Sequence, residues 1–330
     1  MMKEVISLAE KYQDYFKIGV AINPHVLNTS RDLIKKHFNS ITAENEMKPI
    51  SLNREKGKFN FELADGLVNF AKENNMVMRG HTLVWHNQTP DHLFLNEDGS
   101  FVDKEVLEER LREYIRTVFD HFNADLCCWD VVNEAVEDKG DWLLRKSRWL
   151  DIMGENFLDV AFRIARELDP DIKLFYNDYD AVLPHKRDKI YTLVKGMLDR
   201  GVPIDGIGIQ GHWNIHDFKL DDIKAALDKY ASLGLEIHVT ELDVSIYDRE
   251  DRETILEAPT AELLEKQAEF YGDIFAIFRE YKEVVKSVTF WGVADDYSWL
   301  DFFRVRRKNW PMLFDENHQP KEAYWRVIDF

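Results

Sequence analysis

The stretch DLCCWDVVNE (residues 125–134) is an apolar, strand-like run that ends on a polar pair, Asn133 and Glu134. A second stretch of the same form, EIHVTELDV (236–244), carries Glu241 near its end. A carboxylate is costly to remove from water, so it seldom stands where a buried strand stops unless an ion partner or a chemical task holds it there. The two stretches indicate either two carboxyl groups facing each other across one pocket, which is the equipment for breaking a glycosidic bond, or two separate structural ion pairs.

Six further apolar runs of similar length lie on either side of these two. Amphipathic segments such as 62–74 and 107–122 separate them, so strand-like and helix-like stretches alternate along the chain. This alternation is typical of βα units, and eight of them in 330 residues predict an α/β fold, a single (β/α)₈ TIM barrel domain over residues 1–330. An open, doubly wound sheet is the alternative, but no glycine-rich phosphate loop follows a run. The eight runs are 16–22, 38–45, 76–85, 125–134, 173–178, 204–212, 236–244 and 287–294.

Polar residues gather at the C-terminal ends of these runs. Active sites of TIM barrels lie at the C-terminal ends of the strands, and the beginnings of the runs carry no comparable cluster. This one-sided placement favours a functional site over scattered ion pairs. The residues concerned are Glu44, Asn45, His81, Asn133, Glu134, Asn177, Asp178, Gln210, His212, Glu241 and Asp243.

The net charge of −18, from 43 basic and 61 acidic residues, argues against two classes of partner. An acidic surface repels phosphate backbones and anionic lipid, so we expect neither a nucleic acid nor a membrane partner. No apolar segment reaches the roughly 20 residues that span a bilayer. The oligomeric state, monomer or homodimer, stays open.

The only cysteines, Cys127 and Cys128, are neighbours in a predicted strand. Adjacent side chains on a strand point to opposite faces and do not easily form a disulfide. We expect both thiols to be buried and reduced, as in a reducing compartment. The first residues, MMKEVISLAEKYQDYF, lack the apolar core of a signal peptide. These features predict a cytoplasmic protein.

Seven motifs in this chain resemble those of the glycoside hydrolase family 10 endo-1,4-β-xylanases, specifically an intracellular type. They occur in the family's order and span nearly the whole chain. One departure is Asp180, where the family commonly has asparagine, and it affects contacts on the leaving-group side. The motifs are TAENEMKP (42–49), GHTLVWHNQTP (80–90), WDVVNEAV (129–136), FYNDY (175–179), GIQGHW (208–213), HVTELDV (238–244) and FWGVADDYSWL (290–300).

The resemblance implies a retaining, double-displacement enzyme that acts on xylo-oligosaccharides without a metal or cofactor. It assigns Glu134 as the acid/base and Glu241 as the nucleophile. In a retaining pair the carboxyl groups are only ~5–5.5 Å apart. Because two like charges at that distance raise one pKa and depress the other, one carboxyl stays protonated while its partner is ionised.

Residues around this pair are expected to support it. Gln210 and His212 share a face of the sixth strand by two-residue spacing, and His212 is expected to donate to Glu241 while Asp243 holds the histidine, as in the family. Asn133, the family's contact to the sugar 2-hydroxyl, poses a geometric problem. Adjacent strand residues face opposite ways, so the strand must twist or bulge for both Asn133 and Glu134 to serve one pocket.

The resemblance also implies a set of sugar contacts. Aromatic rings in this set suit the apolar C–H faces of sugars. The implied contacts are Glu44, Asn45 and Lys48 on the non-reducing side, His81 and Trp85 near the cleaved sugar, Trp291 and Trp299 at the mouth, and Tyr179 with Asn177 on the leaving-group side.

The sequence also allows alternative interpretations of one cluster and of the function. Arg304, Arg306, Arg307 and Lys308 form a basic cluster that either pairs with acidic residues on the surface or attracts glucuronate branches. A metal-dependent barrel hydrolase would need His81, His86 and His212 to converge, but a five-residue spacing on a strand puts two of these rings on opposite faces. A non-catalytic sugar-binding barrel and a retaining glycosidase of other β-1,4-glycan specificity are the remaining alternatives.

Overall fold

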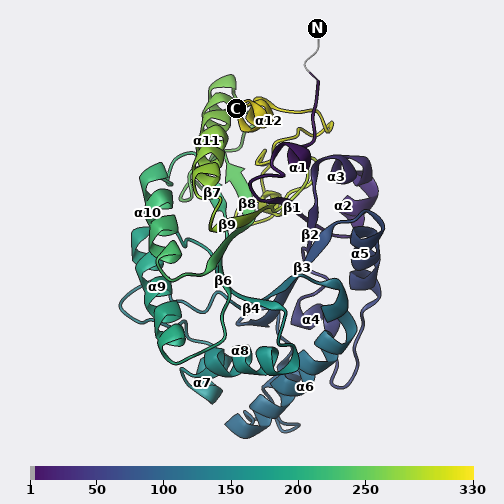
Figure 1. The fold of residues 1–330 in the computed structure, drawn as a ribbon, viewed down its shortest axis with the longest axis vertical. Coiled ribbons are helices and arrows are strands. Elements are labelled where there is room, and N and C mark those ends of the chain that lie inside the picture. Colours follow the sequence, from purple (N-terminus) through teal and green to yellow (C-terminus); the bar gives the residue numbers. More distant parts are fainter. Residues whose placement is uncertain (1–3) are drawn as a thin grey trace.

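Parallel strands form a closed ring at the centre of the protein, with helices around its outside (Figure 1). The computed structural model describes residues 4–330. Every pairing between neighbouring strands is parallel. The strands are β1 (Lys17–Ile22), β2 (Ser40–Ala43), β3 (Val77–Trp85), β4 (Cys128–Asn133), β5 (Lys173–Asp178), β6 (Gly206–Ile209), β7 (His212–Asn214), β8 (Glu236–Ser245) and β9 (Val285–Phe290).

At two places in the ring, strands that are not consecutive in the sequence pair with each other. The first strand pairs with the last, with Gly19 opposite Thr289. Strand β6 pairs with β8, while the short β7 continues β6 and also pairs with β8. Strands β6 and β7 are therefore two parts of one barrel strand, interrupted at Gln210 and Gly211. Eight positions around the ring result, which confirms the predicted TIM barrel.

The helices connect successive strands and bury one face against the barrel. Helix α5, for example, buries Leu67, Phe70 and Ala71 at helical spacing and leaves its other face to solvent. The helices are α1 (Leu8–Lys11), α2 (Pro24–Thr29), α3 (Arg31–His37), α4 (Pro49–Leu52), α5 (Glu62–Glu73), α6 (Lys104–Phe122), α7 (Arg148–Met153), α8 (Phe157–Leu168), α9 (Pro184–Asp199), α10 (Leu220–Ala231), α11 (Ala261–Glu280) and α12 (Glu322–Ile328). Three short 3₁₀ helices are η1 (Asp91–Leu93), η2 (Asn123–Asp125) and η3 (Trp299–Asp301).

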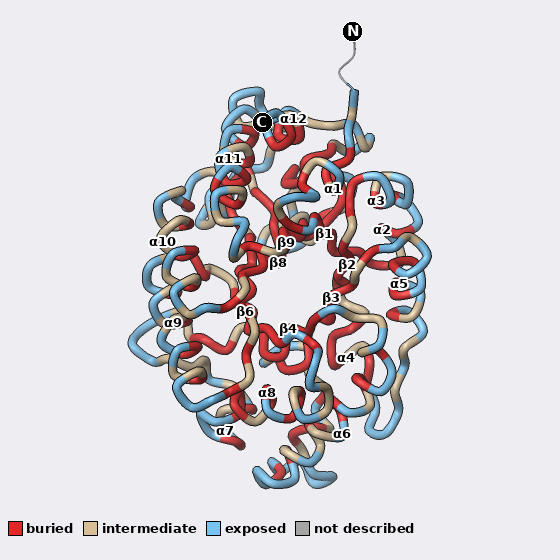
Figure 2. Tube along the Cα trace, viewed as in Figure 1, coloured by how far each residue is buried: buried red, intermediate tan, exposed pale blue. Residues whose placement is uncertain are grey.

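Burial follows the ring: the strands and the inner faces of the helices are buried, and the outer faces are exposed (Figure 2). The space between the barrel and helix α6 is tightly filled. Gly80 on β3 lies beside the fully buried Trp129 of β4, which stacks on Phe119 of α6, and a Cβ added to Gly80 would stand 2.3 Å from the indole ring. Glycine at this position therefore allows the tryptophan to pack between the strands and helix α6.

The segment around Lys11 contacts the C-terminal residues. The ammonium of Lys11 donates to the carbonyl oxygen of Phe330 at 3.0 Å, and the Tyr12 hydroxyl donates to the carbonyl oxygen of Val327 at 2.5 Å. These contacts join the segment before β1 to α12 and to the C-terminal residue that follows it.

The prediction that both cysteines are buried in a strand was wrong for one of them. Cys128 begins β4 and is buried, but Cys127 precedes the strand and is exposed. Both are free thiols, with their sulfur atoms 3.7 Å apart. Residue 127 lies outside the ladder, so its side chain is not confined to the opposite strand face. Within residues 4–330, none of the helices combines the length and the apolar character that crossing a membrane requires.

Candidate active site

A cleft of about 900 Å³ opens at the C-terminal ends of the strands. Nearly all of the site residues expected from the sequence lie along its wall, although they come from distant parts of the chain. Asn177 and Asp178 are the two that do not, because both are fully buried beneath the cleft. The cleft-lining residues are Glu44, Asn45, Lys48, His81, Trp85, Asn133, Glu134, Tyr179, Gln210, His212, Glu241, Asp243, Trp291 and Trp299.

The backbone turns sharply at Glu134, directly after β4. Its φ is +56°, a left-handed conformation that a glutamate adopts only when its surroundings hold it there. The Glu134 amide donates to the carbonyl oxygen of Asn177 at 2.8 Å, and Arg145 Nε donates to the Glu134 carbonyl oxygen at 3.2 Å. The pairing of β4 with β5 also shifts register between Asp130 and Val132. This irregular strand end is how Asn133 and Glu134 both reach the cleft, as the sequence required.

The Glu134 carboxylate accepts two hydrogen bonds from neutral donors. Gln210 Nε2 donates to Oε1 at 3.1 Å, and the indole Nε1 of Trp85 donates to Oε2 at 2.9 Å. Burial raises the pKa of Glu134, and the nearby Glu241 charge raises it further, against the lowering effect of the Gln210 hydrogen bond. Glu134 therefore holds a proton more readily than an ordinary glutamate.

Glu241, on β8, has a different environment. His212 Nε2 lies 3.0 Å from Glu241 Oε2, and His212 Nδ1 lies 2.9 Å from Asp243 Oδ2. Between these two carboxylates the pKa of His212 rises to about 10, because Asp243 and Glu241 outweigh the effect of burial. Burial alone would raise the pKa of Glu241, but the hydrogen bond from His212 and the charges of His81 and His212 bring it below its ordinary value. The predicted contact among these three residues is present.

Amide side chains connect the two glutamates. Asn177 Nδ2 donates at 2.9 Å both to Glu241 Oε1 and to Asn133 Oδ1. Gln210 Nε2, which donates to Glu134, also lies 3.2 Å from Asn133 Oδ1. Asn133 Oδ1 thus accepts hydrogen bonds from the amide groups of Asn177 and Gln210. Asn177 also donates to Glu241 from beneath the cleft. The expectation that Gln210 and His212 lie on one continuous strand was wrong, since Gln210 stands in the gap between β6 and β7.

The part of the cleft wall formed by residues 44–48 contains charged side chains that are largely buried. Lys48 is 7% exposed and donates to Asn45 Oδ1 at 2.9 Å, while its ammonium lies 5.2 Å from the Trp85 ring centre. Glu44 accepts from Asn23 at 2.7 Å. Burial lowers the pKa of Lys48, and the Glu241 charge opposes that change. This wall therefore offers fixed polar atoms for hydroxyl groups of a ligand.

Aromatic rings form another part of the cleft wall. The Trp291 ring lies edge to face with His81, with 5.4 Å between ring centres. Trp299 uses its indole Nε1 to donate to Asp243 Oδ2 at 2.8 Å, which fixes the ring over His212. Two rings held in this way provide flat apolar surfaces beside the carboxyl pair, the kind of surface that packs on a sugar.

One supporting group below the cleft was missed from the sequence. His81 Nδ1 lies 2.9 Å from Asp130 Oδ2, and the Asp130 carboxylate also pairs with the guanidinium of Arg79 at 2.7 Å. Asp130 is fully buried and Arg79 is 1% exposed. Both residues point into the barrel by the two-residue alternation of β3 and β4, a signal that could have been read from their spacing to His81 and Glu134.

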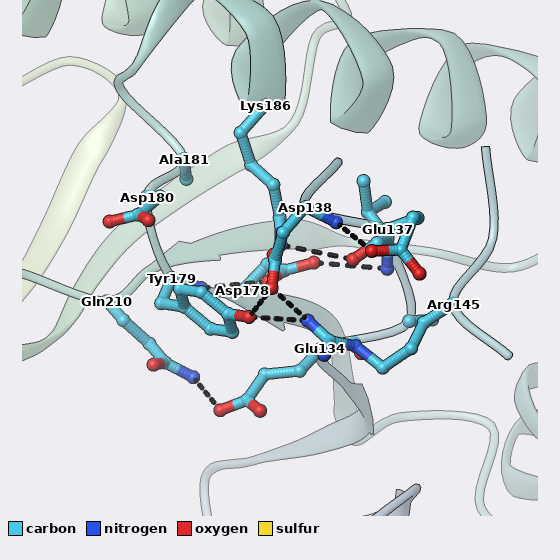
Figure 3. Close-up of polar contacts among 12 residues, drawn as sticks. Glu134, Glu137, Asp138, Arg145, Asp178, Tyr179, Asp180, Ala181, Lys186 and Gln210 are labelled. Atoms are coloured by element: carbon cyan, nitrogen blue, oxygen red, sulfur yellow. Dashed lines mark hydrogen bonds and ion pairs between the residues drawn. The ribbon is translucent and has the colours of Figure 1, made fainter. Parts of the chain in front are cut away.

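Three residues around the expected Tyr179 were missed, in the region where the chain turns back after Glu134. Arg145 donates to Asp138 at 3.0 Å and to the Tyr179 hydroxyl at 2.5 Å, and Tyr179 in turn donates to Asp138 (Figure 3). The Lys186 ammonium lies 2.5 Å from Asp138 Oδ1. No spacing rule in the sequence connects these four residues, because they come from a hairpin, a strand end and a helix.

The departure at Asp180 has a structural counterpart. Asp180 forms a two-bond ion pair with Arg249 from the loop after β8, with 2.7 Å between Arg249 Nη1 and Asp180 Oδ2. Both residues line the cleft, so this pair bridges two loops of its wall. An asparagine in place of Asp180 would keep the hydrogen-bonding shape but not the charge.

The four residues of the basic cluster, 304 and 306–308, have different surroundings. Lys308 lies 2.9 Å from Asp301, which agrees with the surface-pairing interpretation, whereas Arg307 lies 3.4 Å from Asp251 but is only 8% exposed and lines the cleft. Arg304 lines the cleft and packs against Phe303, and Arg306 packs against Phe302. In the described part of the chain, no three His, Cys, Asp or Glu side chains are grouped so that they could hold a metal ion.

A closed parallel barrel with two differently tuned carboxyl groups in one cleft, beside fixed aromatic rings, defines a barrel glycoside hydrolase. The family model for glycosyl hydrolase family 10 matches residues 7–330. The chain belongs to glycosyl hydrolase family 10.

Several named relatives match over nearly their full length. The chain is 52% identical over 328 residues to endo-1,4-beta-xylanase A of Caldicellulosiruptor saccharolyticus, covering 98% of this chain and 96% of that protein. It is 49% identical to an endo-1,4-beta-xylanase of Geobacillus stearothermophilus, with 100% of both chains covered. The crystal structure of an endo-1,4-beta-xylanase from Caldicellulosiruptor owensensis superposes with a TM-score of 0.97 at 51% identity, covering 99% of this chain and 100% of that one.

Proposed function

We propose that this protein is a retaining endo-1,4-β-xylanase that hydrolyses xylo-oligosaccharides and xylan fragments. The observation that carries the proposal is the opposite tuning of Glu134 and Glu241 within one cleft, in a chain about half identical to proteins named as endo-1,4-beta-xylanases over their full length. The free thiols Cys127 and Cys128 support a second proposal, that the enzyme works in a reducing compartment.

In the first step, the ionised Glu241 attacks the anomeric carbon of the sugar. Glu134 gives its proton to the glycosidic oxygen, so the leaving sugar departs as a neutral alcohol and a glycosyl ester forms on Glu241. The charged His212 favours the ionised form of Glu241 before attack. Gln210 and Trp85 hold the Glu134 carboxyl in place for the transfer.

In the second step, Glu134 has lost its proton and removes one from a water molecule. That water attacks the anomeric carbon, the bond to Glu241 breaks, and Glu134 regains its proton. Two inversions leave the β configuration unchanged. Asn133, whose amide oxygen is held by Asn177 and Gln210, keeps its NH₂ group available for the sugar 2-hydroxyl, a contact that strengthens in the transition state.

Two substitutions separate these roles. Glu134→Ala should abolish hydrolysis of xylo-oligosaccharides but spare the first step on aryl xylobiosides with good leaving groups, because those need no proton. Azide should restore turnover of this variant and give a β-azide. Glu241→Ala should be inactive on both substrates, since no covalent intermediate can form. Glu137→Ala, in the same loop but outside the cleft, is the matched control.

The measurements are initial rates on both substrate types and proton NMR of the first product formed. An α-configured first product would contradict the retaining mechanism, and identical behaviour of the two variants would contradict the assignment of roles. Cello-oligosaccharides assayed beside xylo-oligosaccharides test the sugar preference. Faster cleavage of the cello-series would replace the xylanase proposal with the other β-1,4-glycan specificity.

A further inference from the structure

A short hairpin follows Glu134 directly and forms the rim of the cleft on the leaving-group side. We call residues 136–144 the rim hairpin. Val136 and Leu144 form an antiparallel bridge, the Glu137 amide donates to the Leu143 carbonyl oxygen at 3.0 Å, and the Arg145 amide donates to the Ala135 carbonyl oxygen at 2.8 Å. The hairpin therefore has its own backbone pairing.

Two lysines of helix α9 fix this hairpin from outside. Lys186, only 3% exposed, donates to the Val136 carbonyl oxygen at 3.1 Å and to Asp138 at 2.5 Å (Figure 3). Lys189 donates to the carbonyl oxygens of Glu137 at 3.0 Å and Gly140 at 2.8 Å. A loop held at these points presents its tip in a defined place, at little cost in conformational entropy when a ligand binds there.

The tip carries Trp142, whose exposed fraction is 80%. Within the described residues, this is the most exposed of the large apolar side chains. Its neighbours Leu143 and Leu144 pack partly against the main core, so the hairpin turns its other apolar residues inward. An indole displayed on a fixed hairpin is a ready surface for a flat apolar ligand face.

The hairpin continues the cleft. Asp138 and Lys139 line the cleft, while Trp142, three residues further on, does not. The hairpin begins two residues after the proposed proton donor and contacts Tyr179 through Asp138, on the side where the proposed mechanism releases the leaving sugars. The same hairpin thus joins the cleft wall at Asp138 and Lys139 to the exposed indole of Trp142.

We propose that Trp142 is a sugar-stacking platform outside the cleft that binds the leaving-group side of long β-1,4-linked chains. The ligand is a neutral polysaccharide or long oligosaccharide, whose sugar rings offer apolar C–H faces to the indole and whose lack of charge avoids repulsion by the acidic surface. The proposal rests on the proposed function, because it extends the same substrate beyond the cleft.

The test compares affinity for short and long chains. In a Glu241→Gln background, which prevents cleavage, dissociation constants for xylotriose and for soluble linear xylan are measured by titration calorimetry. Trp142→Ala should raise the Kd for soluble xylan about 3- to 10-fold, as expected for loss of one aromatic stacking contact, and leave the Kd for xylotriose unchanged. Trp142→Phe should fall between, since it keeps a smaller ring.

Leu63→Ala is the matched control, because Leu63 is also exposed, at 57%, but lies on α5 outside the cleft wall. The proposal would be overturned if Trp142→Ala left the Kd for xylotriose and the Kd for soluble xylan both unchanged from those of the Glu241→Gln protein. An equal loss of affinity for both ligands would also overturn it, since Trp142 would then act through the cleft. Dissociation of a dimer by Trp142→Ala, seen by sedimentation, would assign the indole to a second copy of the chain instead. If the Glu241→Gln protein binds neither ligand and the wild-type enzyme cleaves neither, the proposed function is refuted rather than the role of Trp142.

Discussion

Replacing His212 by glutamine tests whether this histidine is a permanent cation in the cleft. His212 lies between the carboxylates of Glu241 and Asp243, at 3.0 and 2.9 Å, and its side chain is 18% exposed. Glutamine keeps a similar length and can donate one hydrogen bond, but it cannot carry a charge. The substitution therefore removes the positive charge while leaving a donor beside Glu241.

The size of the effect follows from the pKa of His212, which folding raises from 6.5 to about 10. A histidine whose pKa is raised in the folded state stabilises the protein fully below its unfolded value, and this stabilisation is lost as the pH rises through the folded value. At about 1.4 kcal/mol per pH unit, the contribution is about 4 kcal/mol at pH 6.5 and about 1 kcal/mol at pH 9. The variant should be less stable than the parent by similar amounts, so the difference shrinks as pH rises.

Urea unfolding of the two proteins at pH 6.5, 7.5 and 9, followed by tryptophan fluorescence, measures this difference. A difference in the free energy of unfolding that stays constant between pH 6.5 and 9 would refute the reasoning, because His212 would then be neutral in the folded protein. The kcat/KM profile gives a second readout. Its acidic limb should move to higher pH in the variant, since Glu241 loses the cation that lowers its pKa.

Three further predictions concern other parts of the molecule. Gly80→Ala should destabilise the fold by about 1–3 kcal/mol, because the new methyl group overlaps the Trp129 ring; unchanged stability in thermal unfolding would contradict this packing. Arg145→Met should move the alkaline limb of kcat/KM to higher pH, since the guanidinium lowers the pKa of Glu134, while Arg145→Lys should keep the limb near its original place. Cys127 should react with a thiol reagent at a rate that is half-maximal near pH 7, because its contact with Cys128 brings the thiol pKa to about 7; an equally fast reaction in Cys127→Ser would assign the reactivity to the other thiol.

The strands of the barrel were predictable because parallel strands that are buried on both faces consist of nearly continuous apolar residues. Strand β5 occupies residues 173–178 as expected, and the runs at 76–85 and 236–244 differ from β3 and β8 by one residue at one end. The break at Gln210 and Gly211 was not predictable, since the run 204–212 continues through it without a change in pattern.

Within the site, residues on strand ends were predictable and residues on loops were not. The cleft position of Glu241 and its contact with His212 follow from strand spacing and barrel order. The placement of Arg145 and Lys186 depends on how the rim hairpin folds against helix α9, and loop contacts of this kind leave no periodic signal in the sequence. Cys127 was misplaced for a related reason, because one residue decides whether a side chain lies inside or outside a strand.

The meeting of Lys11 with Phe330 makes this barrel a natural subject for circular permutation. A short linker could join Phe330 to the residues just before Lys11, since Lys11 and Phe330 are already in contact. New ends opened in a turn that precedes a strand, such as the one at Gly234, would leave every loop that carries a cleft residue covalently whole. The order of strands along such a rewired chain would change, while the ring that sets the spacing of Glu134 and Glu241 would not.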